Sequence, residues 1–398
     1  MPASQLSLSW MDARNHLLLR LAAIGAATAG PVHAMALKKM AELGWWQEWW
    51  IGRNLQRHLG PHAKADAPRL PSADVAADTL WGPASGLSAS DLSDTEAVDR
   101  AKLYLLGTLE MHLELLDKAP ADDDALYFFR AALAREEALN EDLLVLANQH
   151  GLQGPRGGAG SMFGVELPAP VATREPLWFP SGRSSFGVSP DEGFAVEHQG
   201  PRHEVDLPEF EIDAQTVTWQ QYTEFVNDGG YDRQELWQSG GWEWLQGLVQ
   251  REGKRAPAFV EQMGGTSGAA LQQHFGQPMR MLGNQVAMHV SWWEADAWCR
   301  WAGRRLPAEA EWDLAARQGT RRGFRWGEVH EWCANTFKPY PGCVPGPLRS
   351  LWEPHVGRTR VLRGASFATR PLLRTSSVRT WAQPQDDHLF CGFRSCAF

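Results

Sequence analysis

One acid-rich stretch, LAREEALNEDLL at residues 133–144, has the composition expected of a metal-binding helix. Its apolar residues recur at helical intervals, and residues three or four apart on a helix share one face, which is the spacing that pairs of metal ligands use. The stretch contains no histidine, however. A solvated helix face carrying Glu136, Glu137 and Glu141 is the alternative interpretation of the same pattern. Metal binding therefore has to be judged from other parts of the chain.

Histidines elsewhere offer few substitutes. His16 and His112 lie in segments with helical periodicity, where a lone histidine is usually a partly buried polar residue. His330, in the loop WGEVHEWCANTF, is expected to pack or to hydrogen-bond locally. A rebuilt metal site that uses His112 with glutamates remains an open alternative.

The composition limits the class of protein. A length of 398 residues favours two domains. The net charge of −9, without any block of lysine and arginine, argues against nucleic acid as a partner. Five cysteines, none in a CxxC pair, suit a reducing compartment, so a cytoplasmic location is expected.

Two kinds of membrane-related segment are not expected. The stretch LAAIGAATAGPVHA imitates a signal peptide, but charged residues interrupt what precedes it, and an ordinary amphipathic helix is the preferred interpretation. No run approaches the ~20 apolar residues that a membrane-spanning helix needs.

The periodicity of the chain divides it into two parts. Helices are expected at 10–30, 36–58, 94–118 and 122–150, with a polar loop at about 60–92, which together suggest a four-helix bundle with one long crossover. Glycine and proline without periodicity predict a linker at 152–175. Short strands, frequent turns and only two helices, at 218–228 and 291–302, predict an α+β domain. The expected domains are therefore 1–151 and 176–398, joined by 152–175.

Several phrases of the second domain occur together in a known family. They are PRHEVDLPEFEIDAQTVTWQQYTEFV, AMHVSWWEADAWCRWAGRRLPAEAEWDLAAR, VLRGASFATR and GFRSCAF. They resemble the formylglycine-generating-enzyme (sulfatase-modifying-factor) family, which implies a mixed fold related to C-type lectins. The generating enzymes use a pair of redox cysteines before the final GFR segment. Residues 363–390 contain no cysteine here, so that oxidase chemistry does not carry over.

The first domain narrows the resemblance. GWWQEWWIGRN and DDALYFFRAALAREE resemble the DinB-like helical domain of the ergothioneine sulfoxide synthases and, within them, the selenoneine synthase branch. This resemblance implies an enzyme that uses non-haem iron(II) and dioxygen. Its substrates would be hercynine and a thiol or selenosugar donor, joined through a C–S or C–Se bond.

The resemblance also implies where the iron ligands should stand. The family's three histidines correspond here to Glu42, Arg135 and Leu139, and Glu141 occupies the place of the motif's final glutamate. Arginine stays protonated and leucine has no lone pair, so one carboxylate remains where three donors are needed. We therefore expect a Glu42–Arg135 ion pair to close the former iron cavity, with Leu139 as an apolar plug.

The substrate-binding phrase has diverged as well. Its counterpart is RTWAQP, in which Arg379, Thr380, Trp381 and Gln383 are the candidate contacts. The face of Trp381 suits a trimethylammonium group through cation–π attraction. The tyrosine that acts as an acid in the ergothioneine branch aligns with Phe337, and Tyr340 lies close by in the sequence.

Three functional hypotheses follow. The first is a working iron-dependent C–S or C–Se bond-forming enzyme, as the resemblance over both domains implies. The second is a catalytically silent homologue that binds hercynine-like betaines or a partner protein, and the altered ligand positions favour it. The third is a different enzyme whose rebuilt metal site uses Glu42, Glu141 or His112.

Overall fold

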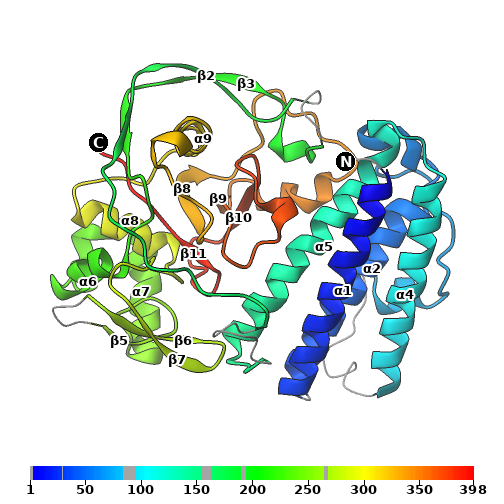
Figure 1. The fold of residues 1–398 in the computed structure, drawn as a ribbon, viewed down its shortest axis with the longest axis horizontal. Helices are drawn as coiled ribbons and strands as arrows, with labels where there is room; N and C mark the ends of the chain where they lie inside the picture. Colours follow the sequence, from blue (N-terminus) through cyan, green and yellow to red (C-terminus); the bar gives the residue numbers. More distant parts are fainter. Residues whose placement is uncertain (1–2, 29, 84–94, 155–162, 190–193, 264–267) are drawn as a thin grey trace.

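The computed structural model describes residues 3–28, 30–83, 95–154, 163–189, 194–263 and 268–398. Four long helices pack together in the first part of the chain (Figure 1). They are α1 (Ala3–Ala27), α2 (Pro31–Gln47), α4 (Thr95–Asp117) and α5 (Asp123–Gln149). The four predicted helices are thus confirmed, although α1 begins seven residues earlier than expected and α2 passes into a π-helix, η1 (Glu48–Gly52). The short helix η2 (Arg57–His62) spans the predicted boundary between the second helix and the loop, and α3 (Ala77–Leu80) lies in the predicted loop.

The helix ends follow from local chemistry. Pro31 stands at the first turn of α2, where its missing N–H is not needed. Asp122 caps α5 because its side chain accepts a hydrogen bond from the Ala125 N–H at 2.8 Å. The cap fixes where α5 begins, and α5 then runs along the second part of the chain (Figure 1).

The second part of the chain combines small sheets with short helices. A four-stranded sheet has the order β10-β9-β8-β11, in which β11 is parallel to β8 and the other pairs are antiparallel. Its strands are β8 (His330–Thr336), β9 (Arg360–Gly364), β10 (Arg379–Ala382) and β11 (Cys391–Gly392). An antiparallel sheet joins β5 (Val260–Met263), β6 (Ala270–His274) and β7 (Gln277–Met281). Two further pairs are β1 (Leu177–Phe179) with β4 (Phe210–Ile212) and β2 (Gly182–Phe186) with β3 (His203–Leu207).

Four α-helices pack around these sheets. They are α6 (Trp219–Asn227), α7 (Ser239–Glu252), α8 (Trp292–Trp301) and α9 (Glu309–Gln318). The sequence predicted α6 and α8 but missed α7 and α9. At the start of α8, Ser291 and Glu294 form a capping box, in which each side chain accepts from the other's backbone N–H. The α+β character of the chain is therefore confirmed, with more helix than the sequence suggested.

The two parts share a hydrophobic core along α5. Leu139 and Leu143 of α5 belong to the same buried cluster as Phe275, Val286 and Phe390 of the second part. Phe163, from the predicted linker, is buried in this cluster too and lies 5.3 Å from the Phe275 ring. The domain limits 1–151, 152–175 and 176–398, and the DinB-like relation of the helices, stay predictions. No described helix is long and apolar enough to cross a membrane.

Candidate functional site

The acid-rich helix face is not solvated. Glu136 is fully buried in α5, where its carboxylate accepts hydrogen bonds from Trp10 (2.8 Å), Arg14 (2.6 Å) and Gln47 (2.7 Å). Glu137 is also buried and pairs with Arg370 at 3.0 Å. The alternative of a solvated face is therefore wrong, because each of these carboxylates holds a partner from a distant part of the chain.

Glu141 connects α5 to the second part of the chain. Its carboxylate accepts hydrogen bonds from Ser366 (2.5 Å) and Thr369 (2.6 Å), and it pairs with His330 at 3.0 Å. Burial alone would raise the pKa of Glu141, but the adjacent imidazole and the three hydrogen bonds outweigh it and lower the pKa to about 2. Burial opposes protonation of His330, yet Glu141 outweighs it and raises the pKa of that imidazole. The expectation that His330 bonds locally is wrong, since its partner lies in α5.

We expect Glu141→Gln to weaken the contact between the two parts. Removing one member of a buried ion pair costs about 3 kcal/mol in the free energy of unfolding. The Glu141 contribution is present above its unfolded pKa, near 4.3, and is lost as the pH falls through its folded value. The His330 contribution is present below its unfolded pKa, near 6.5, and is lost as the pH rises through its raised folded value.

The difference in stability between wild type and Glu141→Gln should therefore be largest between about pH 4.5 and 6.5. Chemical unfolding followed by circular dichroism across this range measures it. Glu110→Gln, at an exposed position of α4, is the matched control and should change the stability by less than about 0.5 kcal/mol at every pH. A Glu141→Gln effect as small as that of Glu110→Gln would contradict the assigned role.

The three positions expected to hold iron do lie together. Glu42 of α2 and Arg135 and Leu139 of α5 line one cavity of about 570 Å³. The predicted neighbourhood of these side chains is thus confirmed. Other lining residues used below are Lys38, Lys39, Trp45, Trp46, Trp81 and Asp142.

The predicted ion pair and the predicted closure of the cavity are wrong. The Glu42 carboxylate pairs with Lys38, one turn away on α2, at 3.8 Å, and 47% of the Glu42 side chain is exposed. The Arg135 guanidinium instead lies over the Trp46 ring at 4.6 Å, and its Nε has no hydrogen-bond partner among the described residues. Leu139 is buried in the wall of the cavity without filling it.

These side chains do not fit an iron(II) ion. Arginine and leucine donate no lone pair, and the one carboxylate at the expected positions is engaged by Lys38. His112 is buried against the Trp10 ring at 5.4 Å, so the structure does not bring it to Glu42 or Glu141 for a rebuilt site. Across the described ranges, no three histidine, cysteine, aspartate or glutamate side chains are grouped as a metal would require.

The charges in the cavity favour a zwitterion. Lys38, Lys39 and Arg135 supply positive charge, and Glu42 and Asp142 supply negative charge. Burial lowers the pKa of Arg135 and Asp142 opposes this shift. Asp142 is exposed to solvent, and the desolvation caused by the surrounding protein atoms raises its pKa, while Lys39 opposes the rise. Each charge therefore stabilises an opposite one, and a ligand carrying both signs can bind without leaving either set unpaired.

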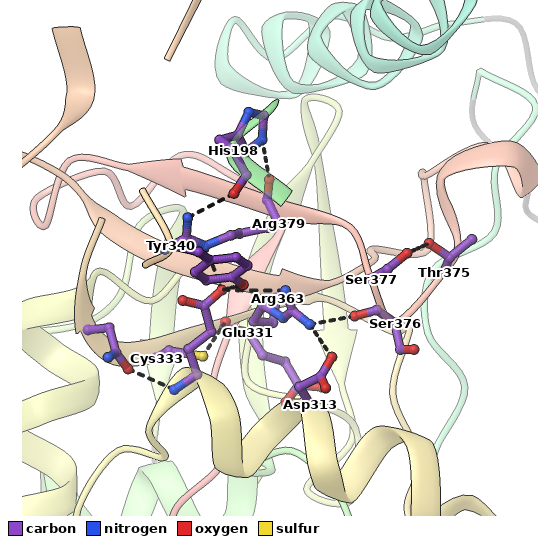
Figure 2. Close-up of polar contacts among 12 residues, drawn as sticks. His198, Asp313, Glu331, Cys333, Tyr340, Arg363, Thr375, Ser376, Ser377 and Arg379 are labelled. Carbon is purple, nitrogen blue, oxygen red and sulfur yellow. Dashed lines mark hydrogen bonds and ion pairs between the residues drawn. The ribbon is translucent and has the colours of Figure 1, made fainter. Parts of the chain in front are cut away.

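The predicted substrate contacts form a second cluster, shown in part in Figure 2. Arg379 is buried, donates to Glu309 at 2.6 Å and lies over the Tyr340 ring at 4.2 Å. Tyr340 donates to the same carboxylate at 2.8 Å, and burial raises the pKa of its phenol well above the usual range. The Trp381 ring packs on Phe337 at 4.2 Å.

The other two predicted contacts lie on or after β10. Thr380 pairs with Leu362 of β9 in the sheet, and the Gln383 backbone N–H donates to Asp386 at 2.8 Å. The structure thus brings four of the six predicted residues together: Phe337, Tyr340, Arg379 and Trp381. None of the six is among the described residues that line the cavity at Arg135.

Some of the cavity-lining residues that were not predicted could have been found from their spacing in the sequence. Lys39, Glu42 and Trp46 follow one another at intervals of three and four on α2, and Asp142 lies three residues after Leu139 on α5. Trp81 comes from a segment without periodicity, so no local pattern could place it there.

Comparison with known proteins identifies the second part of the chain. The family described as the sulfatase-modifying factor enzyme 1-like domain matches residues 164–328 and 325–397. The chain belongs to this family. It is 28% identical over 342 residues to a hercynine oxygenase of Mycobacterium tuberculosis, covering 74% of this chain and 77% of that protein. It is 32% identical to a formylglycine-generating enzyme of Streptomyces coelicolor, covering 50% and 80% of the two chains.

A third family relative shows that catalysis is not universal among these proteins. It is named the inactive C-alpha-formylglycine-generating enzyme 2 of Mus musculus. The identity is 31%, over 40% of this chain and 51% of that protein. The family assignment therefore fixes the fold and a relation to hercynine oxygenases, and leaves the chemistry to be argued from the residues.

Proposed function

We propose that this protein binds a small amino-acid betaine, with hercynine as the first candidate, and does so without iron-dependent chemistry. One observation supports this most strongly. The positions of Glu42, Arg135 and Leu139 line a cavity of about 570 Å³ that has aromatic and charged walls but, among the residues that the structure describes, no set of metal donors. Cavities of about 300–1,000 Å³ suit small ligands.

The walls offer a place for each end of such a ligand. Trp45, Trp46 and Trp81 present aromatic surface, which attracts a trimethylammonium group. Glu42 and Asp142 add negative charge beside it, and Lys39 and Arg135 can receive the ligand's carboxylate. The names of the mycobacterial relatives, hercynine oxygenases, support hercynine as the betaine.

The alternative is the activity that the resemblance implies, C–S or C–Se bond formation on hercynine with iron(II), dioxygen and a thiol or selenosugar donor. The similarity to a hercynine oxygenase over 74% of the chain favours it. The side chains at the expected ligand positions oppose it. Metal analysis after anaerobic incubation with iron(II) distinguishes the two: near-stoichiometric iron would overturn the proposal of a silent binding protein.

Calorimetry with hercynine tests the site directly. Trp46→Ala removes an aromatic wall, and a cation–π contribution of about 0.5–2 kcal/mol corresponds to affinity that is about 2- to 30-fold weaker. Trp178→Ala, at an exposed tryptophan of β1, is the matched control and should bind as wild type does. No heat at millimolar hercynine would contradict the proposal. Weaker binding in Trp381→Ala, with Trp46→Ala unchanged, would instead place the ligand at the second cluster.

A further inference from the structure

Arg135 is a half-buried arginine whose hydrogen-bond donors are unused. Its Nε is buried without a partner, and within the described part of the chain no oxygen accepts a hydrogen bond from its guanidinium. Other arginines of the helical part differ from it: Arg14 donates to Glu136 at 2.6 Å, and Arg53 donates to Asp78 at 2.6 Å. Because Arg135 lines the cavity of about 570 Å³, an acceptor that enters this cavity can reach its unused donors.

The Trp46 ring restricts the orientation of Arg135. The Cζ atom of Arg135 lies 4.6 Å from the centre of this ring, which is within the range of a cation–π contact. The ring itself is held in place, because Trp46 is only 8% exposed and packs beside Trp50 at 6.4 Å. A guanidinium that lies over a ring keeps its N–H groups at its edge, where they can still donate. Trp46 therefore orients Arg135 before any ligand binds, which lowers the entropy cost of binding.

The charges of the cavity leave one positive charge unmatched. Among the described lining residues, three cations face two carboxylates. Lys38 pairs with Glu42 at 3.8 Å, and Asp142 attracts both Lys39 and Arg135. One negative charge is therefore missing, and Arg135 is the cation without an ion pair among the described residues. A single missing charge favours a carboxylate over a phosphate, which carries a charge of about −1.5 to −2 at pH 7.

We propose that Arg135 selects the ligands of this cavity by their carboxylate and that Trp46 positions it, an inference that rests on the proposed betaine function. The carboxylate accepts two N–H groups of the guanidinium side by side, an arrangement that suits these two planar groups. Since Arg135 occupies one face of Trp46, the rings of Trp45 and Trp81 are left for the trimethylammonium group. A cation that lacks the carboxylate leaves Arg135 unmatched and adds a further positive charge beside it.

Calorimetry with two ligands tests the selection. Hercynine and trimethylhistamine share the imidazole and the trimethylammonium group, and only hercynine has a carboxylate. The wild type should bind hercynine at least about tenfold more tightly, which is equivalent to about 1.4 kcal/mol. Arg135→Met should weaken hercynine binding by about the same factor. The variant should bind trimethylhistamine as tightly as the wild type or more tightly, because a repelling charge is gone.

Two variants are the matched controls. Lys39→Met removes another cation of the cavity, and Arg130→Met removes an arginine of α5 that is not among the described lining residues. Both should keep the preference of the wild type for hercynine. A preference that disappears in Lys39→Met and persists in Arg135→Met would overturn the assignment to Arg135.

Trp46 has a separate readout. Trp46→Ala should weaken the binding of hercynine and leave that of trimethylhistamine unchanged, because the ring acts through Arg135. Trp46→Phe keeps an aromatic face and should bind hercynine nearly as the wild type does. Equal weakening of both ligands by Trp46→Ala would show that this ring contacts the trimethylammonium group directly, and it would overturn the positioning role.

The wild type alone distinguishes two kinds of failure. Equal affinities for hercynine and trimethylhistamine would overturn the selection by Arg135, while betaine binding would stand. Binding of neither ligand at millimolar concentration would contradict the proposed function, and the selection by Arg135 would fall with it.

Discussion

Replacing Glu42, Arg135 and Leu139 together by histidine should create a tight site for a divalent metal ion. The three positions line one cavity, and two of them are four residues apart on α5, so two imidazoles would share a helix face and the third would approach from α2. The substitutions also remove the half-buried guanidinium of Arg135, whose positive charge opposes a cation. Three imidazoles with open positions for water are a recognised ligand set for such ions.

Cobalt(II) is the suitable probe for this variant. Binding to the triple variant should give visible d–d absorption at near-stoichiometric cobalt, and a chelator should remove it. The control Arg135→His/Leu139→His keeps two ligands on one helix and should bind at least about tenfold more weakly, which is the effect of about 1.4 kcal/mol for one lost ligand. Equal affinities would show that α2 does not approach closely enough, and the cavity would then not correspond to the iron site that the sequence resemblance implies.

The resemblance to a known family predicted the cavity positions, and local patterns did not reveal the partners of these side chains. The spacing of residues 135 and 139 on a helix follows from the 3.6-residue period, which also located the four long helices. The pairing of Glu42 could not be read in the same way. Lys38 stands one turn away on α2, and the Trp46 face offers Arg135 a second favourable contact. Lys38, Trp46 and Arg135 compete for the available contacts in this cavity. The sequence does not show which of these contacts has the lowest free energy.

The prediction of a solvated face for the acid-rich stretch was wrong for a related reason. Glu136 looks like a surface residue in its own segment, and its burial depends on Trp10, Arg14 and Gln47, which are 126, 122 and 89 residues away. Helix α7 was missed because its first turn contains two glycines, which are poor helix formers. Tertiary packing overrides local preference in both cases, and only the folded chain shows it.

Arg394→Leu should cause the largest loss of stability of any single substitution considered. Arg394 and Glu331 are both fully buried, and the guanidinium donates to both carboxylate oxygens, at 2.5 and 2.7 Å. It also donates to the Asp213 carbonyl at 2.8 Å and lies over the Phe324 ring at 3.9 Å. The leucine variant leaves Glu331 buried with Trp312 as its remaining described donor.

An uncompensated buried carboxylate costs about 3–5 kcal/mol in the free energy of unfolding. The exposed pair of Arg183 and Asp206 is the matched control, and Arg183→Leu should cost less than about 1 kcal/mol. The double variant Glu331→Met/Arg394→Leu removes both charges from the interior and should recover most of the loss, because the penalty comes from the unpaired carboxylate more than from the missing attraction. Unfolding in guanidinium chloride measures all four proteins. A double variant as unstable as Arg394→Leu would show that the arginine acts through its contacts with Asp213 and Phe324, and not by neutralising Glu331.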